Sequence, residues 1–169
     1  VRLHEVFRQA QQSAIVRGAH SVLEGRLPET TPRGTKADGD LFLIAETDAE
    51  RILERLIQAL KRMAIAYGLD PLKDVQVMTP MRRGPLGTHN LNEVLQNAFN
   101  PGADGGVANA YRLGDKVMQL RNDYDKEVYN GDLGEVVRID GGVTHVRFDE
   151  RVVQYGADEL DSISLAYAC

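Results

Sequence analysis

Residues 78–99 read MTPMRRGPLGTHNLNEVLQNAF, and this stretch decides how the rest of the chain is organised. It follows a strand-like run, residues 75–78, and turns through two prolines and two glycines before a helix begins. Asn90 is a favourable N-cap residue, and Glu93 stands three positions later, as in a capping box. From Leu91 to Phe99 the apolar residues then follow the spacing of one buried helix face. The stretch therefore predicts a strand, a turn and a helix that stops at the following Asn-Pro-Gly.

A strand, a turn and a helix in this order place several polar side chains at the carboxyl edge of a sheet. Backbone N–H groups and the helix dipole attract anions there, and α/β proteins bind ligands at that edge. A phosphate, of a nucleotide or of a nucleic-acid backbone, is the ligand that the pattern favours. The alternative is a surface loop whose arginines are only solvated. The side chains concerned are Thr79, Arg82, Arg83, Thr88 and His89.

Helices and strands alternate on the N-terminal side of this stretch. Residues 12–23 predict a helix with a buried face of Ile15, Ala19, Val22 and Leu23, and the apolar run 41–45 predicts a buried parallel strand. This rhythm indicates an α/β fold with a parallel sheet and crossover helices.

The longest predicted helix follows the apolar run. Thr47 and Glu50 form a capping box at its start, and Gly68 ends it. The apolar stripe from Ile52 to Tyr67 is assigned to the core and to no function.

The rhythm changes after the glycine-rich residues 101–106. Short strand-like runs occupy residues 116–121, 133–139, 143–148 and 151–155, with turn residues between them. These runs predict a small β-barrel over residues 110–159. Residues 161–168 predict one further buried strand that returns to the first sheet, which makes the barrel an insert in the α/β domain.

Composition bounds the remaining possibilities. The chain has 169 residues, of which 43% are hydrophobic and 27% charged, as in an ordinary globular protein. Its net charge of −5 speaks against a dedicated nucleic-acid coat, although Arg82 and Arg83 stand apart from the acidic residues between positions 38 and 54. The single cysteine, Cys169, excludes a disulfide within the chain and favours a reducing, cytoplasmic setting. No run is apolar enough to predict a membrane span. The first residue, Val1, and the apolar C-terminal run lead us to expect a fragment of a longer protein.

Several motifs of complete enzymes are absent from the sequence. It contains no P-loop and no G-x-G-x-x-G after a strand, and its four histidines lack the spacing of metal ligands. We therefore expect no metal site and no complete active site in the chain alone.

Four segments, taken together and in order, resemble the C-terminal motor half of RecD-like (RecD/TraA-type) DNA helicases of superfamily 1. They are LHEVFRQA at residues 3–10, VQVMTPMRRGPLGTHNLNEVLQ at 75–96, GDKVMQLRNDYDKEVYNGDLG at 114–134 and LDSISLAYA at 160–168. The resemblance implies a second RecA-like motor domain over residues 1–109 and 160–169, with an inserted SH3-like β-barrel over residues 110–159. It implies ATP-dependent 5′-to-3′ movement on single-stranded DNA, in the setting of DNA repair and recombination. ATP and Mg²⁺ would be bound mainly by an upstream RecA-like domain of the same protein.

The resemblance also assigns roles to residues. Arg8 matches the arginine that reaches the γ-phosphate across the cleft, with Gln9 beside it at the nucleotide; the alternative for Arg8 is a surface arginine at the start of a helix. Residues of the 79–90 loop, now including Asn90, would contact the single-strand backbone.

In the barrel, a polar and aromatic hairpin would contact DNA bases. Its residues are Asn122, Tyr124, Lys126, Tyr129 and Asn130. Packing of Tyr124 and Tyr129 within the barrel or the hairpin is the alternative.

We therefore expect a helicase fragment that is inactive without its P-loop domain, with no membrane partner. A non-catalytic single-stranded nucleic-acid-binding module is the competing interpretation. A protein-interaction domain is a third, and it predicts no salt-dependent binding of oligonucleotides.

Overall fold

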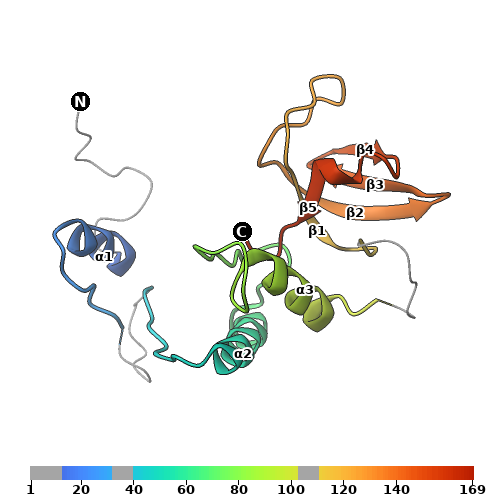
Figure 1. The fold of residues 1–169 in the computed structure, drawn as a ribbon. Helices are drawn as coiled ribbons and strands as arrows, with labels where there is room; N and C mark the ends of the chain where they lie inside the picture. The colour runs from blue at the N-terminus through green and yellow to red at the C-terminus, as the bar shows by residue number, and fades with distance from the viewer. Residues whose placement is uncertain (1–12, 32–39, 103–110) are drawn as a thin grey trace, which may run out of the picture. The chain divides into compact units, whose positions relative to one another are not determined.

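A computed structural model describes residues 13–31, 40–102 and 111–169 of the chain (Figure 1). The chain divides into two units, Val1–Glu46 and Thr47–Cys169. No helix in the described ranges has the length and apolar character needed to cross a membrane.

The described part of the first unit contains one helix, α1 (Ala14–Leu23). Its N-cap is Ser13, and the carboxylate of Asp40 accepts a hydrogen bond from the backbone N–H of Ala14 at 2.7 Å. The expected buried face is wrong in this structure, because Val22 and Leu23 are exposed while Ala14 and Gly18 are buried. The side chain of Leu41 packs against Gly18, where a Cβ would lie only 2.9 Å from it. The helix therefore buries the face that carries Gly18, because only a residue without a side chain leaves room for Leu41.

The expected buried strand over residues 41–45 is also wrong. No strand forms there, and Phe42 and Leu43 are 56% and 67% exposed. Apolar character alone does not make a strand, because a strand also needs a neighbouring backbone to form hydrogen bonds with. Between described residues the structure gives one such bond here, from the N–H of Thr31 to the carbonyl of Leu41.

The second unit begins with α2 (Ala49–Tyr67). Its N-cap is Asp48, one residue after the expected Thr47, because the Asp48 carboxylate accepts a hydrogen bond from the N–H of Arg51 at 2.9 Å. Gly68 ends the helix in the left-handed conformation, as predicted. Leu60 is buried, whereas Tyr67 is exposed and was wrongly assigned to the core stripe.

The next helix, α3 (Thr88–Phe99), starts three residues before the expected position. Its N-cap is Gly87, and the side chain of Asn90 donates to the carbonyl of Pro85 at 2.7 Å instead of capping the helix. Leu91 and Leu95 are buried as predicted and share a core with α2 and the C-terminal residues.

The predicted β-rich half is confirmed. Five strands form one antiparallel sheet in the order β4-β3-β2-β1-β5 (Figure 1). Gly141 and Gly142 have φ of 57° and 82° and make the two-residue turn between β2 and β3. The strands are β1 (Lys116–Gln119), β2 (Leu133–Asp140), β3 (Val143–Phe148), β4 (Arg151–Tyr155) and β5 (Ile163–Leu165), with a 3₁₀ turn, η1 (Leu160–Ser162), before β5.

The chain is thus α/β, and the sheet that the structure shows is antiparallel. The sequence predicted one strand over residues 161–168, and this is wrong. Within that range β5 pairs with β1 of the antiparallel sheet, and only Ala168 pairs in parallel with Val77. Two flanking bonds extend this pairing, from Thr79 N to Cys169 O (2.8 Å) and from Cys169 N to Val77 O (3.1 Å). Among the described residues this is the one parallel pairing.

A buried carboxylate joins α3 to the antiparallel sheet. Asp115, just before β1, is fully buried and accepts hydrogen bonds from Gln96 (2.6 Å) and Asn100 (2.8 Å) of α3 and its C-cap. It also accepts from the Tyr167 hydroxyl at 2.7 Å and from the backbone N–H of Arg112 at 2.6 Å. Burial and the contact with Asp115 raise the pKa of Tyr167. The carboxylate therefore fixes the helix, the sheet and the C-terminal segment to one another.

Candidate nucleic-acid interface

The loop of residues 78–87, here called the basic loop, is closed by its own hydrogen bonds. The Thr79 hydroxyl donates to the carbonyl of Leu86 at 2.8 Å, and the Asn90 side chain donates to that of Pro85. Backbone bonds run from Gly87 to Gly84 (3.0 Å) and from Thr88 to Met81 (2.9 Å). The loop is consequently held in shape by groups that have no charge.

One glycine of the basic loop is required by close packing. A Cβ on Gly87 would lie 2.6 Å from the backbone N, C and O of Arg83, which is shorter than any real contact. The chain therefore folds back on itself at this point, and the fold brings the arginine pair to the outside of the turn. Gly84 supplies the left-handed residue of the turn, with φ of 88°.

The two arginines of the basic loop are exposed, and within the described ranges neither has a carboxylate partner. His89 is exposed as well, and Thr88 is half-buried. An unpaired guanidinium on a rigid loop keeps all its donors for an anion, and a phosphate oxygen fits its planar fork.

The start of α3 offers fewer backbone donors than the sequence suggested. The N–H groups of Thr88 and His89 already donate to the carbonyls of Met81 and Arg82, the second at a long 3.5 Å. The attraction for anions therefore comes from the side chains of Arg82 and Arg83 rather than from these amides. The side chains of Thr79 and Asn90 hold the loop closed.

An open groove of about 690 Å³ begins at the basic loop and runs along α3 toward the antiparallel sheet. Both polar and apolar residues line it. Lining residues include Arg82, His89, Arg112, Met118 and Leu120. Arg112 is engaged, because its guanidinium donates to the carbonyl of Asn100 (2.8 Å) and to the side chain of Asn97 (2.7 Å).

The second candidate region is the loop of residues 121–130 between β1 and β2, here called the tyrosine hairpin. Asp123 pairs with Val128 in an isolated antiparallel bridge, and Val128 is buried in the hydrophobic core of the antiparallel sheet. The Asp123 carboxylate accepts from the N–H groups of Asp125 (3.1 Å) and Lys126 (3.0 Å) and so shapes the turn.

Two exposed tyrosines mark the tyrosine hairpin. Tyr124 and Tyr129 are 73% and 45% exposed, with ring centroids 6.0 Å apart in an edge-to-face arrangement. Asn122 accepts from the backbone N–H of Asn130 at 2.9 Å and holds the two sides together. Of the two alternatives, burial of these tyrosines in the barrel core is wrong, because both are exposed. Packing within the hairpin agrees with their edge-to-face contact, which still leaves ring surface open to solvent.

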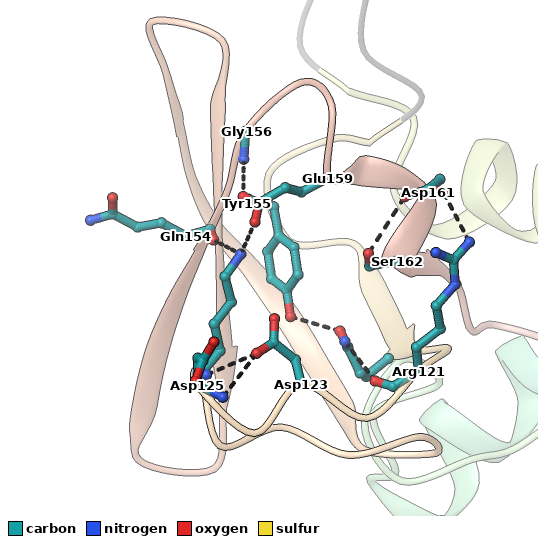
Figure 2. A network of polar contacts seen from close by, with 11 residues as sticks. Arg121, Asp123, Asp125, Gln154, Tyr155, Gly156, Glu159, Asp161 and Ser162 are labelled. Atoms are coloured by element: carbon teal, nitrogen blue, oxygen red, sulfur yellow. Dashed lines mark hydrogen bonds and ion pairs between the residues drawn. The ribbon is translucent and has the colours of Figure 1, made fainter.

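Lys126, which the sequence grouped with the base-contacting residues, is directed elsewhere. Its ammonium donates to the Gln154 carbonyl at 3.0 Å and to Glu159 at 2.5 Å, and it lies 4.7 Å from the centroid of the Tyr155 ring. Figure 2 shows this polar network beside β4, with Tyr155 and Glu159 at its centre. The hydrogen bond from Lys126 holds the pKa of Glu159 below its ordinary value.

Sequence reasoning missed the network and the buried Asp115. Nothing in the local spacing relates Lys126 to Glu159, which follows 33 residues later. The one available signal was a charged residue, Asp115, directly before a predicted strand, where a buried carboxylate needs donors from elsewhere in the fold. Arg8 and Gln9 lie outside the described residues.

The chain is similar in sequence to known DNA helicases. Residues 91–153 match the family described as the SH3 domain of ATP-dependent RecD-like DNA helicases. Over 172 aligned positions, covering 99% of the chain, the sequence is 38% identical to the ATP-dependent RecD2 DNA helicase of Deinococcus radiodurans. The chain spans 22% of the length of that relative.

Solved structures of Pif1 helicases are also similar. One is Bacteroides Pif1 in complex with ADP-AlF3 and single-stranded DNA, with 16% identity, a TM-score of 0.42, and coverage of 77% of this chain and 41% of that one. A second is from a structure of two coordinating Pif1 helicases at forked double-stranded DNA, with 16% identity, a TM-score of 0.39, and coverage of 78% and 38%. Both TM-scores are low, and the resemblance to RecD-like helicases is confirmed by the sequence matches alone.

Proposed function

We propose that the chain supplies part of the single-stranded DNA track of an ATP-dependent DNA helicase that moves 5′ to 3′. The observation that carries the proposal is the basic loop, on which Arg82 and Arg83 are exposed and have no carboxylate partner in the described part of the chain. Its context is a chain 38% identical to a RecD2 helicase.

Within that helicase, residues 1–109 and 160–169 form the second RecA-like motor domain and residues 110–159 an inserted SH3-like barrel. The match of residues 91–153 to a helicase SH3 family supports the second assignment. The parallel pairing of Val77 with Ala168 supports the first, because it joins segments on both sides of the barrel.

Single-stranded DNA is bound by two regions that do different work. The basic loop and the start of α3 follow the phosphate backbone: Arg82, Arg83, Thr88 and His89 contact it, and Thr79 and Asn90 hold the loop in the shape that allows this. The tyrosine hairpin, through Asn122, Tyr124 and Asn130, contacts bases, since exposed aromatic rings stack on nucleobases regardless of sequence.

ATP and Mg²⁺ belong mainly to the upstream RecA-like domain. The described residues do not fit a metal, since among them no three His, Cys, Asp or Glu side chains gather closely enough to hold one. We assign Arg8, with Gln9 beside it, to the nucleotide across the cleft, where a guanidinium stabilises the charge of the transferred phosphoryl group.

The test is ATP hydrolysis by the longer protein, with and without single-stranded DNA, for the wild type, Arg8→Ala and Arg82→Ala. We expect DNA to stimulate ATP hydrolysis by the wild type. Arg8→Ala should abolish this stimulated hydrolysis while ATP binding is retained. Arg82→Ala should raise the DNA concentration that is needed for stimulation. The 169-residue chain alone should hydrolyse no ATP. Hydrolysis without any DNA stimulation would contradict the proposal.

The open ring surface of Tyr124 and Tyr129 is equally suited to a non-catalytic module that binds single-stranded nucleic acid. Under that alternative Arg82→Ala weakens DNA binding in the same way, whereas Arg8→Ala changes nothing. The Arg8→Ala variant therefore separates the two candidates.

A further inference from the structure

Lys126 connects the tyrosine hairpin to β4 and to the turn that follows it. The Lys126 ammonium has three N–H groups and three partners. These are the Gln154 carbonyl, the Glu159 carboxylate and the face of the Tyr155 ring. A phosphate could reach this ammonium only by displacing one of these partners.

A second connection reaches the other end of the tyrosine hairpin from the same tyrosine. The Tyr155 hydroxyl donates to the side-chain carbonyl of Gln119 at 2.7 Å, and the Gln119 amide donates to the Arg121 carbonyl at 2.9 Å. Tyr155 and Gln119 are both 1% exposed. Figure 2 shows Tyr155 between two residues of the hairpin, with Asp125 on the left and Arg121 on the right.

We propose that Lys126 is a positioning residue: it fixes the tyrosine hairpin so that Tyr124 faces single-stranded nucleic acid, and it makes no phosphate contact of its own. The proposal rests on the proposed function, which assigns base stacking to Tyr124. Gln119, Lys126, Tyr155 and Glu159 together are called the clamp.

An ordinary surface ion pair would not have this effect. An isolated Lys–Glu pair in solvent contributes little, because two long side chains lose freedom to form it. Here the Lys126 side chain is only 24% exposed, and a carbonyl and an aromatic face hold the ammonium in addition to Glu159. Three simultaneous partners from β4 and the following turn define one position for the lysine, and with it the backbone of the hairpin.

The experiment measures binding of the chain to a fluorescein-labelled oligothymidylate of about 16 nucleotides at several salt concentrations. Lys126→Met keeps the aliphatic stem over Tyr155 and removes the ammonium. We expect about tenfold weaker binding with the salt dependence unchanged. The control is Arg138→Met, which also removes one positive charge but whose ion pair, with Asp140, lies away from the hairpin at the end of β2; its binding should stay within about twofold.

A double-mutant cycle with Tyr124→Ala decides the role of the lysine. In the wild-type background Tyr124→Ala should weaken binding about tenfold, and in the Lys126→Met background it should have less than about a twofold effect. Equal effects of Tyr124→Ala in both backgrounds, or a salt slope reduced by Lys126→Met, would overturn the proposal and make Lys126 a direct phosphate contact.

Glu159→Gln tests the clamp from its other side with nearly the same shape, and it serves if Lys126→Met fails to fold. It should weaken binding in the same direction and speed hydrogen exchange of the hairpin amides. Unchanged exchange in both variants would overturn the proposal. If the wild-type chain does not bind the oligonucleotide, the proposed function fails, whereas faster exchange in both variants would still support the clamp.

Discussion

The basic loop and the tyrosine hairpin present side chains to solvent by different means. The basic loop is held by backbone amides, carbonyls, a hydroxyl and an amide side chain, none of which titrates. The tyrosine hairpin depends on an ammonium, a carboxylate and a phenol. The basic loop should therefore tolerate changes of pH, while the tyrosine hairpin should respond to them.

The largest effect should come from breaking the junction between the two regions. Asp115→Ala removes the acceptor of hydrogen bonds from Gln96, Asn100 and Tyr167, and the buried Tyr167 hydroxyl loses this partner. Because unsatisfied buried donors are costly, we expect a loss of about 3 kcal/mol or more in the free energy of unfolding. Urea denaturation measures it, and Asp149→Ala, at an exposed turn, is the control. A loss below about 1 kcal/mol would contradict the role of Asp115 as the junction.

Alkaline pH should release the tyrosine hairpin and the sheet before it affects the basic loop. Burial raises the pKa of Tyr111 to about 12, and burial with nearby carboxylates raises that of Tyr155. A raised pKa in the folded state means that the stabilisation is complete below the ordinary value of 10.0 and is lost as pH rises toward the folded value. For Tyr111 the free energy of unfolding should fall by about 2 to 3 kcal/mol over this pH range.

Hydrogen exchange is too fast to follow at such pH, so the measurement is phenolate absorbance together with circular dichroism during a pH jump. We expect phenolate to appear in step with loss of the β signal. Ionisation of the buried tyrosines with the sheet intact would contradict the prediction.

Gly87→Ala should disrupt the basic loop alone. The added methyl group meets the Arg83 backbone, so the turn must open, at a cost of about 2 kcal/mol. We expect weaker oligonucleotide binding with a lower salt dependence, while the barrel keeps its hydrogen-exchange protection. Gly141→Ala, where a Cβ would meet nothing within 4 Å, is the matched control for backbone strain without a clash. If Gly87→Ala binds DNA as the wild type does, the shape of the basic loop is not needed for DNA binding, and the prediction is wrong.

Replacing one arginine should have a smaller effect. Arg82→Ala and Arg83→Ala should each weaken binding about fivefold, or roughly 1 kcal/mol, and similarly for all sequences. Each should also lower the salt slope by about 0.7, the value for one phosphate of a single strand. The lysine variants, which keep the charge, should recover most of the slope. If neither alanine variant changes the slope, the arginines are only solvated.

The smallest effect concerns acid. The Lys126 hydrogen bond lowers the pKa of Glu159 below its ordinary 4.5, so the stabilisation is present above that value and is lost only as pH falls through the lower folded value. Hydrogen exchange of the hairpin amides should therefore stay slow down to pH values below 4.5 in the wild type, whereas in Lys126→Met it should be faster already at neutral pH and should not change as Glu159 is protonated. Equal profiles would show that the ion pair does not hold the hairpin.

The sequence predicted the local features well and the long-range ones less well. The strands of residues 143–148 and 151–155 were predicted to the residue, because short turns and alternating burial specify antiparallel hairpins locally. The helix starts shifted, since Asp48 competes with Thr47 as a cap and the packing of Gly87 against Arg83 extends α3. The two arginines of the basic loop and the two tyrosines were candidates from residue types; the structure shows that they are exposed, and their contact with DNA stays a prediction. The orientation of Lys126 was not, because its partners follow far along the chain.

The most direct test of the account is the salt dependence of binding between the 169-residue chain and a labelled single-stranded oligothymidylate, for the wild type and the Arg82→Ala/Arg83→Ala double variant. The account predicts that the logarithm of the binding constant falls linearly with the logarithm of salt concentration. The double variant should lose about 1.4 of that slope, the share of two phosphate contacts. Binding that is absent, or that does not depend on salt, would contradict the account and favour a protein-interaction domain.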